Sequence, residues 1–294
     1  MHPLSNSELI LNPDGSIYHL HLHPEQVANT IITVGDPERV KMVSKHFDRI
    51  EHQVQNREFV THTGYIDHQR LTVIATGIGT DNIDIVLNEL DALFNIDLST
   101  RQIKTAFTKL QFIRIGTSGC LRKELPVDTF LISRYAIGMD ALMPYYNYQQ
   151  EDSSKQLEAA LTHALHSTPL RPYVVKNASS LDTALGEGIR KGITITAPGF
   201  YAPQGRQLRA ISTHKDFLES IQKVRTIPIV GLPITNLEME TAGIYGLAKA
   251  LGHEAISFNV LLANRVTGQF SRNPQKAVDR LVELVLSRIT GGFL

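Results

Sequence analysis

The segment Thr30-Ile31-Ile32-Thr33-Val34-Gly35-Asp36-Pro37-Glu38-Arg39 decides the fold class of this chain. Its first five residues are all β-branched, without polar alternation, which predicts a strand buried on both faces. Gly35 then offers a turn, and Pro37 is a typical first residue of a helix. Open α/β sheets bind ligands at the carboxyl edge of their strands, so Gly35 and Arg39 become candidate binding residues.

Further strands and helices follow the same pattern. Runs that lack strict alternation predict strands at 71–76, 111–115, 129–133, 193–197 and 255–262. Helical spacing predicts one helix over 83–94, with Asp81 as its N-cap, and a last helix from Pro274 that closes at Gly291. The alternation predicts a three-layer α/β/α fold with a central mixed sheet. We expect a single domain over residues 1–294, with 1–17 as an N-terminal extension.

Composition narrows the classes of partner and compartment. Lys plus Arg equals Asp plus Glu, 29 each, so no global field draws the protein to nucleic acid or to an anionic membrane. Cys120 is the single cysteine, which excludes an internal disulfide and agrees with a reducing cytoplasm. No run approaches the length of a membrane span. We therefore expect a cytoplasmic protein with neither a nucleic-acid nor a membrane partner.

Three arginines stand near glycine-rich turns and suggest one shared anion. They are Arg39, Arg57 and Arg114, the last followed by Ile115-Gly116-Thr117. The planar fork of arginine matches a phosphate, and the Thr117 hydroxyl and glycine amides could add donors. The alternative is a plain strand-to-helix turn with a solvated arginine. The sequence Gly77-Ile78-Gly79 lacks the full dinucleotide fingerprint, so we reject a dinucleotide site.

Two further segments carry candidate ligand contacts. Glu238 and Glu240 are two residues apart, so they cannot share one face of a helix. They can form an acidic first helical turn, which the helix dipole favours, and they can accept hydrogen bonds from sugar hydroxyls. The two interpretations are compatible. The segment 200–206 offers an aromatic ring, an amide and an arginine, which suit the binding of a planar heterocycle. The alternative is that this segment is only a surface loop. The histidines of 18–23 lack an acid partner or H-E-x-x-H, so the pattern does not favour zinc.

Taken in order, these motifs resemble the nucleoside phosphorylases of the uridine phosphorylase type, from about Tyr18 to the C-terminal helix. The resemblance rests on Gly35-Asp36-Pro37-Glu38-Arg39, Arg57-Glu58-Phe59, Thr76-Gly77-Ile78-Gly79, Arg114-Ile115-Gly116-Thr117-Ser118-Gly119 and Glu238-Met239-Glu240. It implies a three-layer α/β/α fold. It also implies phosphorolysis of a nucleoside to a free base and a pentose 1-phosphate, a pentosyltransferase reaction of pyrimidine salvage.

The resemblance assigns a role to each matching residue. Phosphate would be bound by Gly35, Arg39, Arg114, Thr117 and, from the neighbouring subunit, Arg57. Ribose would be bound by Met239, Glu240 and, across a dimer interface, His19. Uracil would be bound by Phe200, Gln204, Arg206 and Arg265, and the catalytic residues would be Arg206, Gln204 and Arg114. Purine enzymes of the family place a Ser-Asp pair where this chain has Asn264-Arg265.

The resemblance implies no cofactor, with inorganic phosphate as a co-substrate. A potassium ion near Glu58 stays open, because Thr80-Asp81-Asn82 departs from the Gly-Pro-Ser-like run of bacterial relatives. A homo-oligomer built from dimers, expected to be a hexamer, is implied as well. Three alternatives stay open: a thymidine or deoxyuridine preference, a purine nucleoside phosphorylase or nucleosidase of the same fold, and a non-catalytic nucleoside-binding protein.

Overall fold

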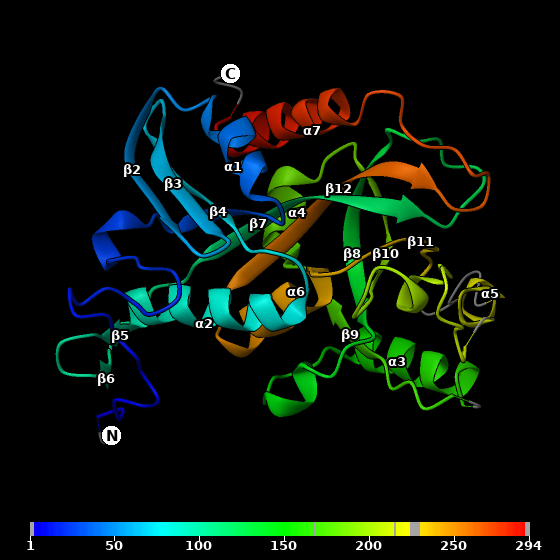
Figure 1. Ribbon diagram of the computed structural model, residues 1–294, viewed down its shortest axis with the longest axis horizontal. Coiled ribbons are helices and arrows are strands. Elements are labelled where there is room, and N and C mark those ends of the chain that lie inside the picture. Colours follow the sequence, from blue (N-terminus) through cyan, green and yellow to red (C-terminus); the bar gives the residue numbers. More distant parts are fainter. Residues whose placement is uncertain (1–2, 167, 215, 224–229, 292–294) are drawn as a thin grey trace.

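A computed structural model describes residues 3–166, 168–214, 216–223 and 230–291 (Figure 1). Its strands are β1 (Thr30–Val34), β2 (Arg49–Asn56), β3 (Phe59–Ile66), β4 (Gln69–Ala75), β5 (Ile96–Asp97), β6 (Gln102–Ile103), β7 (Gln111–Cys120), β8 (Phe130–Gly138), β9 (Tyr173–Lys176), β10 (Arg190–Thr196), β11 (Ile234–Glu238) and β12 (Glu254–Asn264). Its helices are α1 (Pro37–Ser44), α2 (Thr80–Asn95), α3 (Asp152–Ala164), α4 (Ser179–Leu185), α5 (Phe217–Lys223), α6 (Thr241–Ala250) and α7 (Pro274–Ile289). Short 3-10 turns lie at Pro24–Gln26, Met143–Tyr145 and Ala202–Gln204.

The main sheet is mixed, as predicted. Its strand order is β11-β10-β8-β12-β7-β1-β4-β3-β2, and β9 pairs with β8. The strands β1, β4, β7 and β12 run parallel, whereas β2, β3 and β4 form an antiparallel meander. The carboxyl half of β7 also pairs with β11, so β7, β12, β8, β10 and β11 close into a ring. This closure brings the ends of β7 and β11 together.

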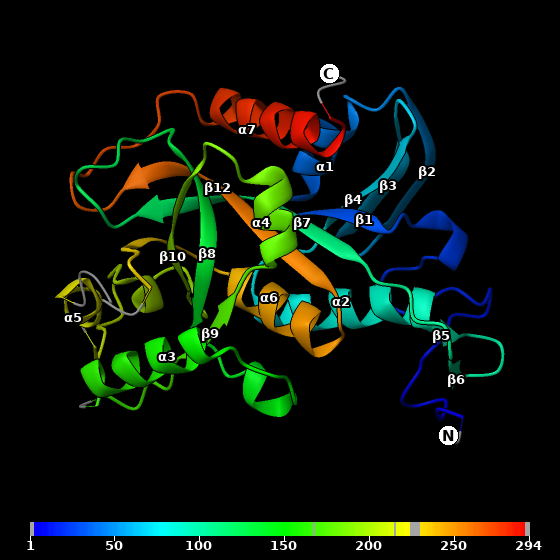
Figure 2. The ribbon, with the colours of Figure 1, turned by 180° about the vertical axis from the view of Figure 1, so that it is seen from behind.

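Helices cover both faces of the sheet, which confirms the three-layer prediction. On one face Ile31 and Phe112 pack with the apolar side chains of α2 and α6. On the other face Ile32 and Ile113 pack with those of α1, α4 and α7. In both views α1 and α7 lie across the strands from α2 and α6 (Figures 1 and 2). The central strands are buried on both faces, which explains why their β-branched residues follow one another without polar alternation.

The first predicted strand matches β1 residue for residue, and α7 begins at Pro274 as expected. The helix ends at Ile289, and Gly291 follows with a left-handed φ of 68°. The N-cap prediction for Asp81 is wrong, because α2 already begins at Thr80 and Gly79 is its N-cap. Gly79 has a φ of 99°, and its amide donates to the buried carboxylate of Glu240, which places the N-cap two residues before the predicted one.

The segment before β7 and the N-terminal segment both pack against the α2 side. In the segment before β7, the two-residue strands β5 and β6 pair with each other. Phe107 from this segment stacks on the imidazole of His253 at a ring separation of 5.5 Å. Leu9 and Ile17 of the N-terminal extension are buried in the same cluster as α2. No helix in the described ranges is long and apolar enough to cross a membrane.

Candidate active site

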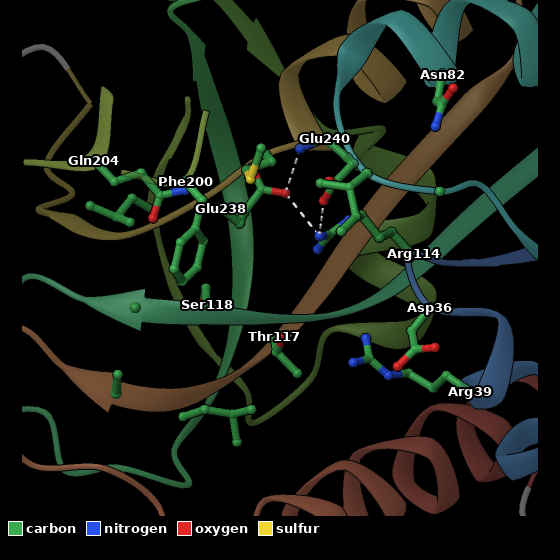
Figure 3. A pocket seen from close by; sticks show the side chains of 18 of the residues that line it. Asp36, Arg39, Asn82, Arg114, Thr117, Ser118, Phe200, Gln204, Glu238 and Glu240 are labelled. Atoms are coloured by element: carbon green, nitrogen blue, oxygen red, sulfur yellow. Dashed lines mark hydrogen bonds and ion pairs between the residues drawn. The ribbon is translucent and has the colours of Figure 1, made fainter. Parts of the chain in front are cut away.

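A pocket of about 710 Å³ opens at the carboxyl ends of β1, β7 and β11 (Figure 3). Its lining comes from eight separate parts of the chain and includes Gly35, Asp36, Pro37, Arg39, Glu58, Gly77, Ile78, Asn82, Arg114, Thr117, Ser118, Gly119, Phe200, Gln204, Arg206, Leu237, Glu238, Met239, Glu240, Leu262, Ala263 and Phe270. Figure 3 places Asp36 and Arg39 at one end and Phe200 and Gln204 at the other. The two ends therefore differ chemically.

Arg114 is the buried centre of the pocket. One terminal nitrogen, Nη2, lies 3.0 Å from a carboxylate oxygen of Glu238 and 2.6 Å from one of Glu240. The other, Nη1, donates to Oδ1 of Asn259 at 3.1 Å. Burial acts to lower the pKa of Arg114, but the two glutamates outweigh burial and raise it. Arg114 is therefore a fixed cation, and it has donors left for a ligand.

The guanidinium of Arg114 needs the glycine two residues later on the same strand. A Cβ built on Gly116 would lie 1.8 Å from Nη1 of Arg114 and 2.5 Å from its Cζ. Residues i and i+2 of a strand share one face, so the guanidinium lies directly over Gly116. The glycine of the Arg-Ile-Gly-Thr motif is thus explained by space for the arginine.

The two glutamates differ in how much of their hydrogen-bonding capacity is used. Glu238 accepts from the Thr196 hydroxyl, the Thr241 hydroxyl and the amides of Glu240 and Thr241, in addition to Arg114. Its carboxylate is therefore saturated, and it caps the first turn of α6. Glu240 accepts from Arg114 and from the Gly79 amide. Burial raises the pKa of Glu240, which Arg114 opposes. Its oxygens keep room for a further donor.

The Arg39 end of the pocket has an unpaired cation. Arg39 lies in the first turn of α1, whose N-cap Asp36 accepts from the amide of Glu38. Within the residues that the structure describes, no side chain or carbonyl bonds the Arg39 guanidinium. Burial lowers the pKa of Arg39, with Arg114 adding to the effect and Asp36 opposing it. An anion held there would gain a charged donor beside the Thr117 hydroxyl and a helix N-terminus.

The opposite end of the pocket is a preassembled group of three side chains. Arg206 donates to the carbonyl oxygen of Phe200 at 2.8 Å and to Oε1 of Gln204 at 2.6 Å, and its Cζ lies 3.8 Å above the Phe200 ring. Arg265 donates to the Gln204 carbonyl at 3.1 Å. Burial and then the charge of Arg265 lower the pKa of Arg206. The Gln204 side chain is buried, and its Nε2 has no partner in the described ranges.

Three of the predicted site residues lie outside this pocket. Arg265 acts on the Gln204 backbone, as just described. Arg57 is exposed in the β2–β3 turn, with its Cζ 5.5 Å from the Tyr18 ring centre. His19 is bound to Glu89 through its Nδ1 at 2.6 Å, and the same carboxylate accepts from the amides of His19 and Leu20. Glu89 thereby anchors the whole N-terminal turn to α2.

The remaining predicted residues are brought together, and the pocket adds several that sequence reasoning missed. The predicted residues in the lining are Gly35, Arg39, Arg114, Thr117, Phe200, Gln204, Arg206, Met239 and Glu240. Among the missed ones, Asn82 packs its amide over Gly77, and Ser118 follows Thr117 on β7. Ser118 stood inside a recognised motif and could have been found. Asn82 carries no sequence signal of its own.

The possibility of bound metal concerns Glu58 and the histidines of residues 18–23. Glu58, Ile78 and Asn82 line the same end of the pocket, next to Gly77. His21 pairs with Asp14 through a carboxylate contact of 3.1 Å, away from His19 and its Glu89. In the described part of the chain, no three histidine, cysteine, aspartate or glutamate side chains gather into a set that could hold a metal ion.

Fold and pocket together define an α/β enzyme site that pairs an anion-accepting end with an end built for a flat polar ring. Comparison with known families agrees with that class. A model of the phosphorylase superfamily matches residues 29–293, and the chain belongs to that family.

Individual relatives are similar at moderate identity. A uridine phosphorylase from Thermococcus kodakarensis is 28% identical over 265 residues, which cover 90% of this chain and 83% of the relative. A DeoD-type purine nucleoside phosphorylase from Oceanobacillus iheyensis is 22% identical, covering 92% and 98%. Among solved structures, a Trypanosoma brucei nucleoside phosphorylase that shows uridine phosphorylase activity superposes with a TM-score of 0.85 at 27% identity, covering 96% of this chain and 99% of that one.

Proposed function

We propose that this protein is a uridine phosphorylase, which converts uridine and inorganic phosphate reversibly into uracil and ribose 1-phosphate. The observation that carries the proposal is the two-ended pocket. One end holds Arg39, which has no hydrogen-bond partner among the described residues, beside the fixed cation Arg114, and the other end holds the Arg206–Gln204–Phe200 group. A phosphate suits the first end, and the ribose hydroxyls suit Glu240 between them.

The base end fits the edge of uracil. Arg206 holds Oε1 of Gln204, so the free Nε2 can donate to one carbonyl oxygen of uracil, while the second lone pair of Oε1 accepts from N3–H. Remaining N–H groups of Arg206 can donate to the other carbonyl oxygen. Cytosine and adenine present an amino group at that edge, which would face these donors unfavourably.

Among the described residues, a second observation bears on the choice of base: the pair of positions that supplies an acid to a departing purine in purine enzymes of the family carries no carboxylic acid here. This chain has Asn264-Arg265 where purine enzymes of the family carry a Ser-Asp pair. The Asn264 side chain donates to the carbonyls of Arg122 and Leu125, and its oxygen accepts from the amides of Val266 and Thr267. The neighbouring Arg265 turns to the Gln204 backbone. These contacts support a pyrimidine base over a purine.

In the proposed reaction, a phosphate oxygen attacks C1′ of the ribose while the C1′–N1 bond breaks and its electron pair leaves with uracil. Positive charge grows on the ribose and negative charge on the uracil oxygens. The phosphate stabilises the first, and Arg206 and Gln204 stabilise the second. Arg114 and Arg39 position the phosphate, so catalysis is positioning plus electrostatics and requires no covalent enzyme intermediate. Uracil then takes its proton from solvent.

The site is proposed to be completed by a second subunit, which supplies Arg57 to phosphate and His19 to ribose. Their exclusion from the pocket of their own chain supports this arrangement. A mixture of Arg57→Ala and Arg39→Ala subunits tests it. Each variant alone loses activity, but random hybrid dimers contain one intact site, so about a quarter of all sites should recover. Recovery in no mixture would show that both residues serve the same chain's site.

Several broader assignments extend the proposal. The oligomer is proposed to be a hexamer built from three dimers. The cellular role is proposed to be pyrimidine salvage in the cytoplasm, which the buried, unpaired Cys120 supports. No cofactor is assigned beyond the co-substrate phosphate. A potassium ion beside Glu58 remains a proposal that dialysis against sodium and potassium salts would test. Residues 1–294 are proposed to act as one domain, with 1–17 as an N-terminal extension.

Base release tests the proposed function. The purified protein is incubated with uridine, thymidine, deoxyuridine, cytidine or inosine, with and without phosphate, and release is followed by absorbance. We expect uracil from uridine only when phosphate is present. Equal release without phosphate would identify a nucleosidase, and cleavage of inosine in place of uridine would show that the base end was misassigned. Binding of uridine without turnover would indicate a non-catalytic binding protein.

A further inference from the structure

A closed ring of hydrogen bonds lies beneath the pocket and includes Arg114. Nη1 of Arg114 donates to Oδ1 of Asn259 (3.1 Å), whose Nδ2 donates to the hydroxyl of Ser257 (3.1 Å). The hydroxyls of Ser257 and Thr241 lie 3.0 Å apart. The Thr241 hydroxyl donates to Oε2 of Glu238 (2.9 Å), which lies 3.0 Å from Nη2 of Arg114. All five residues are at most 5% exposed.

The direction of each hydrogen bond in this ring is fixed by chemistry. The Glu238 carboxylate can only accept, so the Thr241 hydroxyl donates its single hydrogen to Glu238. The Ser257 hydroxyl must then donate to Thr241, and it is left to accept from Nδ2 of Asn259. Arg114 can only donate, so Oδ1 of Asn259 accepts from it. In the four hydrogen bonds through Asn259, Ser257 and Thr241, every donor therefore points from Arg114 toward Glu238, and the direct contact between Nη2 of Arg114 and Glu238 closes the ring.

Position 259 must both accept from the arginine and donate to Ser257, which a side-chain amide does and a carboxylate cannot. A second bond, from Nδ2 to the Ser133 hydroxyl at 3.2 Å, holds the amide in that orientation. An aspartate there would reverse the Ser257 hydroxyl, leave the Thr241 oxygen without a donor, and place a third carboxylate on Arg114.

We propose that Asn259 is a positioning residue: its neutral amide fixes the Arg114 guanidinium over Gly116 and leaves the positive charge of Arg114 available for phosphate. The inference rests on the proposed function only in naming phosphate as the ligand of Arg114. Asn259 does not line the pocket and touches no substrate in this arrangement. It acts through Arg114, because its Oδ1 accepts one N–H of the guanidinium and adds no negative charge beside it.

The experiment compares two isosteric substitutions in the same buried network. Asn259→Asp puts a carboxylate against Arg114. Asn236→Asp is the matched control, because Asn236 is equally buried, bonds the hydroxyls of Thr194, Thr235 and Ser118, and has no contact with Arg114. The dissociation constant of inorganic phosphate is measured by calorimetry without nucleoside, and the KM values for phosphate and for uridine are measured in turnover.

For Asn259→Asp we expect phosphate to bind about tenfold or more weakly, because a buried like charge is added beside the anion, while the KM for uridine changes less than about threefold. Asn236→Asp should change phosphate affinity less than about threefold, although both variants lose stability. Unchanged phosphate affinity in Asn259→Asp, or an equal loss in Asn236→Asp, would overturn the proposal.

A second variant covers the case in which Asn259→Asp does not fold. Asn259→Ser keeps a small polar side chain that is too short to reach Nη1 of Arg114, so phosphate binding should still weaken about fivefold. Wild-type phosphate affinity in Asn259→Ser would refute the role of the amide. The calorimetric result is independent of turnover. A wild-type protein that binds phosphate but cleaves no uridine would therefore refute the proposed function. The role of Asn259 would still be decided by the phosphate affinities of the variants.

Discussion

The substitution Gly116→Ala adds one methyl group beneath the Arg114 guanidinium and so tests how closely the two residues pack. A Cβ at position 116 would lie 1.8 Å from Nη1 of Arg114, and real Cβ contacts below 3.0 Å are essentially never seen. The guanidinium must therefore move by roughly an ångström or more, which the close-packed surroundings do not absorb. Its contacts of 2.6 Å and 3.0 Å with the two glutamates cannot survive that shift. Glu240, which then keeps only the Gly79 amide as a described donor, is left as a buried, poorly compensated charge.

The magnitude follows from the cost of breaking a buried pair. That cost is about 3–5 kcal/mol, which for a chain of this size lowers the melting temperature by roughly 5–8 °C. Loss of a positioned donor should also lower kcat/KM for phosphate by about 100-fold. Gly119→Ala is the control on the same strand, because its Cβ would meet Arg265 and Leu237 only at ordinary distances of 3.4 Å and 3.6 Å. Calorimetry decides the point: equal melting temperatures for the two variants would refute the account of Gly116.

Two further predictions concern the base end and the alkaline limit of stability. Arg206→Ala should lower kcat/KM for uridine by about 100-fold, because Arg206 donates where negative charge develops; steady-state kinetics that match wild type would remove it from the mechanism. Burial and the charge of Glu158 raise the pKa of Tyr148 to about 12. The folded state then holds a proton that the unfolded state loses, so this stabilisation is complete below about pH 10 and is lost as pH rises toward 12. Urea unfolding of Tyr148→Phe across that range should show a shallower decline, and an identical decline would contradict the assignment.

The parts of the fold that could be predicted are those in which local pattern and burial agree. Unbroken β-branched runs such as Thr30–Val34 are buried on both faces, so pattern and structure coincide. The strand Arg49–Asn56 was missed because it lies at the edge of the sheet, is largely exposed and carries few apolar residues. The strand Ile234–Glu238 was missed for the opposite reason. It is fully buried yet polar, and its Thr235, Asn236 and Glu238 side chains are satisfied by bonds from distant strands.

The candidate site divides in the same way. Residues in contiguous motifs, such as Gly35 to Arg39 and Arg114 to Thr117, were found because glycine, arginine and strand end stand together in the sequence. Asn259 was not found, since an asparagine in a buried strand gives no local signal. Its role depends on Ser257 beside it and on Thr241 and Glu238 from other elements. Such networks are properties of the closed ring of strands, which no single segment encodes.

The measurement that tests the central claim most directly is phosphorus NMR of the protein with uridine and inorganic phosphate. Direct attack by phosphate predicts that its signal is replaced by that of ribose 1-phosphate, in a one-to-one ratio with uracil. A single displacement also predicts only the α anomer, because the β-linked base leaves from the opposite face. Uracil release with an unchanged phosphate signal and free ribose would contradict the account.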